Sequence, residues 1–320
     1  MATYKGIKGF NIQTVSSDPP APFIGEVWYN STSATVKYRD GATSASWAVG
    51  GSLTTARRSL SGAGTQTAGL AFGGGSGDRT MSEEYNGTSW TNGGSLTTGR
   101  WYMAGCGIQT AALGVGGQLV PGGFTDATEE YNGSSWTNGG NYPATLSHAS
   151  AAGTQTAALA FGGAAPSPAT VTNEYNGSSW TSGGALVNSR ADGAGAGTQT
   201  AGLAVAGNPG PSGVTAAEEY NGSSWTNGGN MVSGGKRFLA AAGLQTAALA
   251  FGGNPTGNPS AEEYDGSSWT ATANLNTGIS YLAGCGTTTA ALSFGGGFTS
   301  AQTEEYTGAV PAATKTVGTD

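Results

Sequence analysis

A tryptophan recurs at nearly constant intervals along most of this chain, and a repeat of that length is compatible with few folds. The intervals are 43 to 46 residues, and five of the six tryptophans end the sequence Glu-Tyr-Asn-Gly-Ser-Ser-Trp or a close variant. An apolar run ending in a glycine pair also recurs six times, once as Ala206-Gly207. Units of about 44 residues are too small to bury their own apolar surface, so they must stack on one another. The six tryptophans are Trp47, Trp90, Trp136, Trp180, Trp225 and Trp269.

The sequence of each unit predicts four short strands. In the first unit, the first strand lies within Arg57 to Ala63, and the second within Thr67 to Phe72. The third strand carries Glu-Glu-Tyr, and the fourth carries the tryptophan. The second strand is apolar on both faces, which is typical of a strand buried between stacked sheets. The Asn-Gly pair between the third and fourth strands predicts a type I′ hairpin turn, with positive φ at both central residues.

The composition agrees with a repeated all-β protein. Glycine supplies 58 of the 320 residues, and each glycine inside a helix costs about 0.5–1 kcal/mol relative to alanine. The 8 Trp, 12 Tyr and 9 Phe argue against disorder. Radial stacking of four-stranded sheets buries both faces and leaves only short edges exposed. The sequence therefore predicts a six-bladed β-propeller with four-stranded antiparallel blades.

The order of the repeated features resembles the kelch repeat over roughly residues 38–306. An apolar strand and a glycine pair are followed by a variable stretch, then by Tyr and Trp, and then by a basic residue ahead of the next unit. The resemblance implies a kelch-like propeller. The interval from Tyr to Trp is five residues, shorter than is usual in kelch repeats. We therefore expect a tighter hairpin and a chain outside the typical cellular kelch group.

Most of the length variation lies in the connection between the second and third strands. In an antiparallel blade, this connection shares a face with the one that joins the fourth strand to the next blade. Binding usually involves variable loops on a rigid scaffold. We therefore expect partners to bind this face, including Gln118 to Thr128 and Asn208 to Ala217.

Eleven of the twelve glutamates lie directly before the repeat tyrosine, or one residue earlier. Adjacent carboxylates can form an acid/base or metal site, but adjacent residues of a strand point to opposite faces. We therefore expect one glutamate of each pair to face solvent and the other to face a basic residue. The basic residues should bind carboxylates or strand-end carbonyls, and no phosphate. They share one register, which Leu146 and Ile279 interrupt: Arg57, Arg100, Arg190 and Lys236.

The cysteines and the single histidine predict no cofactor and no metal site. Cys106 and Cys285 share a register with alanines of other units, so we expect free, buried thiols. The chain has too few Cys and His for a zinc site, or for the copper site of galactose oxidase, an enzyme with kelch-like blades. His148 is expected to be structural or to face solvent. Its register positions would ring the mouth of a central channel: Ser59, Tyr102, His148, Asp192, Phe238 and Tyr281.

Four residues are candidates for binding a ligand or partner. The repeat tryptophans are expected to pack between blades, because they occur in every unit. Trp28 and Trp101 lie outside the period, and Trp101 is followed by Tyr102. Asp78 and Asp126 lie on variable loops and are the only loose candidates for the paired carboxylates of a glycosidase. We predict no catalytic residue and no enzyme activity; the candidate binding residues are Trp28, Trp101, Tyr102 and Asp126.

The N-terminal region differs from the repeats. We expect residues 1–27 to form a docking arm with a Pro-rich connector, residues 28–50 a hairpin and a closing strand, and residues 51–320 the propeller. The segment from Gly25 to Gly41 contains Gly-Glu-Val-Trp-Tyr-Asn and Lys-Tyr-Arg-Asp-Gly. It resembles a segment of structural proteins in tailed bacteriophages, particularly fibres and appendages. The resemblance implies a virion protein.

The expected function is therefore that of a non-enzymatic phage virion structural protein in a tail, fibre or capsid appendage. Its partners would be other virion proteins or further copies of itself. A net charge of −7 argues against nucleic acid or an anionic membrane as the main partner. No signal peptide or membrane span is visible, so the protein would be made in the host cytoplasm. The alternative is a carbohydrate-binding propeller that recognises host surface glycans.

The two ends of the repeat region each hold part of one blade. The last unit has Glu304 to Tyr306 but no tryptophan after it. Trp47 follows no glycine pair, yet it lies 26 residues ahead of Gly73, the usual interval. We expect the Trp47 strand to close the propeller as the outermost strand beside the Tyr306 strand. The alternative is that residues 309–317 form that strand.

Overall fold

The computed structural model describes residues 12–75, 79–164, 167–210, 212–255 and 258–317. These residues form strands and no helix, so the described chain contains no helix that could span a membrane. The chain divides into two compact units. One is Ser46–Gly308, and the other combines Met1–Ala45 with Ala309–Asp320. These boundaries differ from the expected ones at residues 27 and 50.

Six four-stranded antiparallel sheets lie in Ser46–Gly308, and each sheet follows one repeat. The first three sheets comprise β5 (Ser61–Thr65), β6 (Ala68–Phe72), β7 (Ser82–Tyr85) and β8 (Trp90–Asn92); β9 (Ala104–Ile108), β10 (Ala111–Val115), β11 (Thr128–Tyr131) and β12 (Trp136–Asn138); and β13 (Ser147–Thr154), β14 (Ala157–Ala164), β15 (Thr172–Tyr175) and β16 (Trp180–Ser182). The next two comprise β17 (Ala194–Gly197), β18 (Gly202–Val205), β19 (Ala216–Tyr220) and β20 (Trp225–Asn230); and β21 (Ala240–Leu244), β22 (Ala247–Phe251), β23 (Ala261–Tyr264) and β24 (Trp269–Ala271).

The sixth sheet is completed by a strand from the other end of the repeat region. It comprises β25 (Ala283–Gly286), β26 (Ala290–Phe294), β27 (Thr303–Thr307) and β4 (Ser46–Val49). β4 pairs with β27 in antiparallel register, with Trp47 opposite Tyr306. The prediction that the Trp47 strand is the outermost strand of this sheet is confirmed. The alternative, closure by residues 309–317, is wrong.

The chain has a seventh four-stranded sheet, so the predicted number of six was wrong for the whole protein. It comprises β1 (Gln13–Val15), β2 (Val27–Asn30), β3 (Thr35–Arg39) and β28 (Thr314–Thr316), and β1 pairs with β2 in parallel. A repeat count cannot detect this sheet, because its residues lack the tryptophan period and the glycine pair. β1 also lies within the segment that we expected to be an arm.

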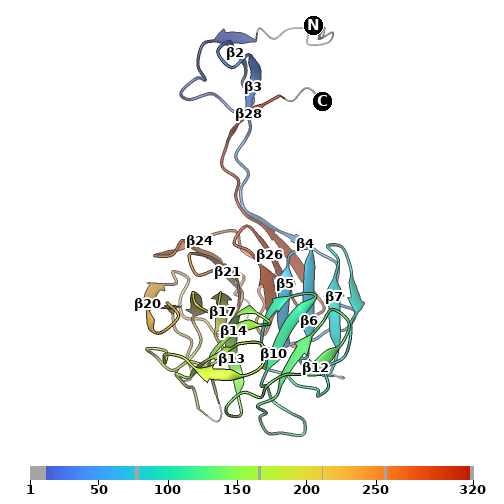
Figure 1. Cartoon of the computed structure of the whole chain (residues 1–320). Coiled ribbons are helices and arrows are strands. Elements are labelled where there is room, and N and C mark those ends of the chain that lie inside the picture. Colours follow the sequence, from blue (N-terminus) through green and yellow to red (C-terminus); the bar gives the residue numbers. More distant parts are fainter. Residues whose placement is uncertain (1–11, 76–78, 165–166, 211, 256–257, 318–320) are drawn as a thin grey trace. The chain divides into compact units, whose positions relative to one another are not determined.

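The six sheets of Ser46–Gly308 follow one another around a common centre (Figure 1). The first strand of each sheet contacts the first strands of two neighbouring sheets, in the order β5, β9, β13, β17, β21 and β25. Strand β25 contacts β5 and so returns to the start. We call this arrangement the ring of sheets. It is a propeller-like arrangement, as the repeat predicted.

The apolar core lies between neighbouring sheets rather than within one of them. One buried cluster combines Leu70 and Phe72 of β6 with Ala112, Tyr131 and Trp136 of the next sheet. Leu70 and Phe72 are fully buried, as expected for a strand that is covered on both faces. Each repeat therefore depends on its neighbours for burial of its apolar side chains.

The connection between the third and fourth strands is not the predicted type I′ turn. Tyr85 pairs with Trp90, so four residues form the connection, and only Gly87 among them has a positive φ (91°). The side chain of Asn86 accepts hydrogen bonds from the backbone N–H groups of Thr88 and Ser89. Asparagine is therefore used here as a side-chain acceptor that organises the turn, and not as a residue of left-handed conformation.

The connection between the second and third strands of a sheet lies beside the connection that joins one sheet to the next, as expected. Trp101, after the first sheet, exchanges backbone hydrogen bonds with Gln118, which follows β10. Ala191 and Asn208 form the same kind of pair two sheets later. The prediction that these connections lie on one face is confirmed, while binding at this face remains a prediction.

Candidate functional site

Buried ion pairs account for the first glutamate of the repeated pair in three of the units. Arg57 donates to Glu83 at 3.0 Å and Arg100 to Glu129 at 2.7 Å, and all four side chains are fully buried. Arg190 pairs with Glu218 in the same way. Burial of the guanidinium groups lowers the pKa of Arg100 and Arg190. These carboxylates therefore stabilise the fold and are not available as an acid/base pair.

The fourth basic residue, Lys236, donates to the carbonyl of Ser260 at 3.1 Å. Burial lowers the pKa of Lys236 to about 8. Together with the three arginines, this confirms that the basic register binds carboxylates or strand-end carbonyls. The unit that has Leu146 in place of the base also has Asn173 in place of the first glutamate. In this unit the loss of the cation is matched by loss of the anion, whereas the unit with Ile279 keeps Glu304, which is buried and accepts backbone hydrogen bonds from Asn276 and Thr277.

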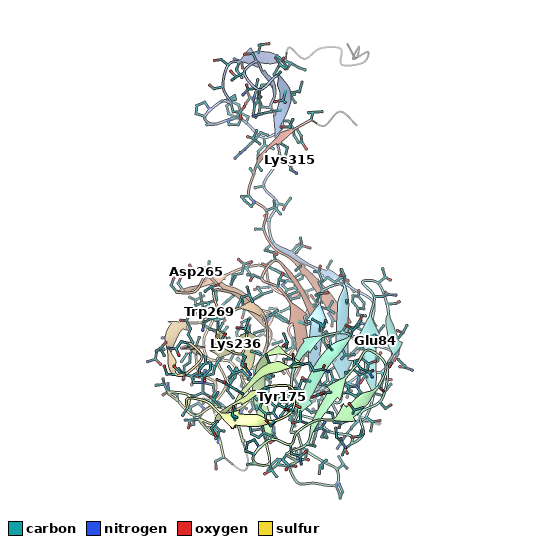
Figure 2. The ribbon with its side chains drawn as sticks, in the orientation of Figure 1. Glu84, Tyr175, Lys236, Asp265, Trp269 and Lys315 are labelled. Carbon is teal, nitrogen blue, oxygen red and sulfur yellow. The ribbon has the colours of Figure 1, made fainter. Side chains whose placement is uncertain are left out.

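The second glutamate of each pair accepts a hydrogen bond from the tyrosine of the following sheet. Tyr131 donates to Glu84 at 2.5 Å, Tyr175 to Glu130 at 2.6 Å, and the series returns to the start with Tyr85 donating to Glu305 at 2.5 Å. Burial and the nearby glutamate raise the pKa of Tyr85, Tyr131 and Tyr175 to about 12. The expectation that this glutamate simply faces solvent was wrong, because it links neighbouring sheets. Figure 2 labels Glu84 and Tyr175, together with Lys236 and Trp269.

A glutamine in the turn between the first two strands also joins the sheets, a role that the sequence analysis did not predict. Gln109 donates to the carbonyls of Gly69 and Tyr85 of the preceding sheet, at 2.9 and 2.7 Å. Gln66 of the first sheet donates to the carbonyls of Ala291 and Tyr306 of the last one, at 3.2 and 2.6 Å. The recurrence of Gly-Thr-Gln-Thr was visible, but a turn sequence alone does not show which backbone it reaches.

The repeat tryptophans pack between sheets, as predicted. Trp136 contacts Phe72 of the preceding sheet with ring centroids 4.8 Å apart, and its indole N–H donates to Ser82 Oγ at 2.9 Å. The two cysteines are free and buried, as predicted. Burial raises the pKa of Cys106 and Cys285 to about 12.

The four candidate binding residues do not form one site. Trp28 is fully buried in the small unit, where its indole N–H donates to Asp18 at 3.1 Å. The indole is therefore not on an exposed surface of the small unit, and binding at Trp28 remains a prediction without support from its burial. Asp126 accepts a hydrogen bond from Asn141 at 3.3 Å, and Asp78 lies outside the described residues.

Trp101 and Tyr102, the next two candidates, lie in the connection between the first two sheets. Their ring centroids are 4.9 Å apart, and the guanidinium of Arg79 lies over the Trp101 ring at 4.7 Å. Tyr102 belongs to the register of His148, which was expected to surround a channel mouth. All six residues of that register line one central cavity of about 140 Å³. We call them the mouth residues: Ser59, Tyr102, His148, Asp192, Phe238 and Tyr281.

The mouth residues are held by a continuous cycle of backbone hydrogen bonds. The N–H of Tyr102 donates to the carbonyl of Ser59 at 2.9 Å, and the N–H of His148 donates to the carbonyl of Tyr102 at 3.0 Å. The same bond continues around the ring of sheets until the N–H of Ser59 donates to Tyr281 at 2.8 Å. All six residues have φ between 53° and 60°. Non-glycine residues rarely adopt this conformation, and such strain persists only where the surroundings enforce it.

Aromatic rings and two titratable groups converge at this mouth. Tyr102 stacks on His148 with centroids 3.9 Å apart, and Phe238 stacks on Tyr281 at 4.0 Å. His148 Nε2 lies 3.8 Å from Asp192 Oδ1. Burial lowers the pKa of His148 to about 4 and raises the pKa of Asp192 to about 7. At a pH between these two pKa values, the imidazole of His148 and the carboxyl group of Asp192 are both neutral.

The residues that the structure describes contain no group of three or more His, Cys, Asp or Glu side chains placed to hold a metal ion. No protein-family model matches the sequence, and a search of curated proteins gives no significant match. The resemblances to kelch repeats and to phage appendage proteins therefore remain arguments from the residues themselves.

Proposed function

We propose that this chain is a non-enzymatic structural protein of a tailed bacteriophage, and that its ring of sheets is a kelch-like propeller used for display and interaction. One observation carries the proposal. The segment that resembles phage appendage proteins forms part of a separate sheet, and both connections of the ring of sheets lead into that sheet. A rigid module held by two connections is suited to presentation by a larger assembly.

The small unit has features expected of a docking module. Asp18 accepts hydrogen bonds from Trp28 and Asn30 and pairs with Lys37 at 2.7 Å, so β2 and β3 are tied to the preceding loop. Phe23 and Ile24, in the same loop region, are 82% and 69% exposed. Adjacent exposed apolar side chains on an ordered unit are a common feature of protein interaction sites. We infer that other virion proteins, or further copies of this chain, cover them.

The proposal can be tested on particles purified from the source of the sequence. Mass spectrometry should detect the chain in virions, and antibodies against Ser46–Gly308 should label an appendage in electron micrographs. A Trp28→Ser variant should unfold the small unit and lose incorporation, whereas Trp101→Ser should still be incorporated. Absence of the wild-type chain from intact virions would contradict the virion assignment.

A second candidate function is recognition of host surface glycans. The observation that favours it is the group of mouth residues, where aromatic rings lie beside a carboxyl group and a hydroxyl group. This candidate does not require the protein to be part of a virion.

A further inference from the structure

The central cavity contains buried polar atoms that have no protein partner. Asp192 Oδ1 and Ser59 Oγ are buried and accept or donate no hydrogen bond within the described structure. The side chain of Asp192 is only 9% exposed. Both residues line the cavity, and they lie half-way around the cycle of mouth residues from each other. A buried polar group without a partner costs about 1–3 kcal/mol, so these atoms mark a place where a ligand can contribute hydrogen bonds.

The remaining mouth residues supply apolar faces. The two stacked pairs lie close together, since the Tyr102 centroid is 6.3 Å from Phe238 and 6.4 Å from Tyr281. These rings help to line a cavity of about 140 Å³, which has room for one sugar-sized ring rather than for a peptide segment. Aromatic faces combined with hydrogen-bonding groups suit a ligand that has both C–H surfaces and hydroxyl groups.

Two arginines lie beside aromatic rings of the mouth. The guanidinium of Arg58 lies 5.9 Å from the Tyr281 ring centroid, and that of Arg237 lies 5.2 Å from the Phe238 centroid. An aromatic cage with a carboxylate would otherwise suit a quaternary ammonium ion. Here the positive charge of Arg237 also acts on the carboxyl group of Asp192, so this side of the mouth disfavours a cation and favours an anionic group near Arg237.

We propose that the mouth residues, together with Arg237, bind one sugar residue that carries a carboxylate, such as a terminal uronic or sialic acid of a glycan. The sugar ring contacts the aromatic faces, its hydroxyl groups bind Asp192 and Ser59, and its carboxylate pairs with Arg237. The inference deepens the glycan-binding candidate and does not depend on whether the chain is part of a virion.

The single histidine provides a direct readout, because a tag-free protein gives one set of imidazole signals in an NMR spectrum. D-glucuronic acid, D-galacturonic acid and N-acetylneuraminic acid are titrated separately, with D-glucose and D-galactose as neutral controls. We expect at least one acid to shift the His148 signals saturably and to bind at least about tenfold more tightly than D-glucose and D-galactose. A tenfold difference corresponds to about 1.4 kcal/mol, as expected for one charged contact.

Variants locate the site. Arg237→Ala and Tyr102→Ala should each weaken binding about tenfold or more, with unchanged far-UV circular dichroism. Arg79→Ala is the matched control, because it removes an arginine stacked on an aromatic ring outside the mouth, and it should bind like the wild type.

Several results would overturn the inference. These are the absence of binding by all three acids at millimolar concentration, equal binding of acids and neutral sugars, and preferential binding of tetramethylammonium. Equal losses in Arg79→Ala and Arg237→Ala would have the same meaning. Each of these results concerns the mouth alone, whereas detection of the chain in virions tests the display function separately.

Discussion

Replacement of Trp47 by alanine should destabilise the ring of sheets strongly, although this residue lies far from its partners in the sequence. Trp47 is 6% exposed, and its ring lies 5.1 Å from Phe251 and 5.0 Å from Tyr306. Its indole N–H also donates to the carbonyl of Ala273 at 2.9 Å. Truncation of a buried tryptophan to alanine costs about 3–5 kcal/mol. For a unit of this size we therefore expect the unfolding temperature to fall by about 6–20 °C, from about 2–4 °C per kcal/mol.

The assay is thermal unfolding followed by near-UV circular dichroism, with denaturant unfolding as a second measure. Val49→Ala is the matched control, since Val49 lies on the same strand and is 74% exposed. Trp136→Ala, at the equivalent position of a sheet formed by continuous chain, should cost about as much as Trp47→Ala. If Trp47→Ala shifts the unfolding temperature no more than Val49→Ala, β4 does not close the ring of sheets.

Three further predictions follow from buried groups. Arg100→Leu should lower the free energy of unfolding, measured with denaturant, by about 3–5 kcal/mol, because Glu129 loses its buried partner. The double variant Arg100→Leu/Glu129→Asn should regain much of that stability, and a double variant that is no more stable would contradict the pairing. Cys106 and Cys285 should react with a thiol reagent only after unfolding in guanidinium chloride, and rapid modification of the native protein would contradict their burial. Burial raises the pKa of Asp192 from 3.8 to about 7, so between these pH values the folded state binds more protons than the unfolded state. As pH rises across this window, the wild type should therefore lose stability relative to Asp192→Asn, by up to about 4 kcal/mol at about 1.4 kcal/mol per pKa unit. A parallel pH dependence of the two proteins would contradict the shifted pKa.

The structure of the individual sheets could be predicted from the sequence, because it depends on short-range patterns. The apolar second strand, the glycine pair and the Glu-Tyr to Trp interval all lie within one unit of about 44 residues. Even the pairing of Arg100 with Glu129 was suggested by two registers that repeat together. The hairpin turn was wrong in detail, because the sequence Asn-Gly fits both a two-residue turn and a longer turn organised by the asparagine side chain.

The candidate site could be predicted only in part. The register that contains His148 was visible, and so was the expectation that it surrounds a channel mouth. The sequence did not show that all six positions adopt positive φ, or that Asp192 and Ser59 lack protein partners. Trp28 was selected because it lies outside the period, but burial in a separate unit removes it from any surface.

The sequence by itself determined that the chain forms repeated four-stranded sheets with a buried, apolar second strand, since these features depend on residues that are neighbours along the chain. Only the tertiary structure decided between the two possible closing strands, showed where a seventh sheet forms, and showed that the residues of the central register adopt positive φ and that Asp192 and Ser59 lack protein partners. The physical reason is the separation of the partners along the chain. The bond from Tyr85 to Glu305 spans 220 residues, and Gln66 reaches Tyr306 across 240. No local pattern specifies such a contact, which forms only when the complete set of sheets brings the first and last repeats together.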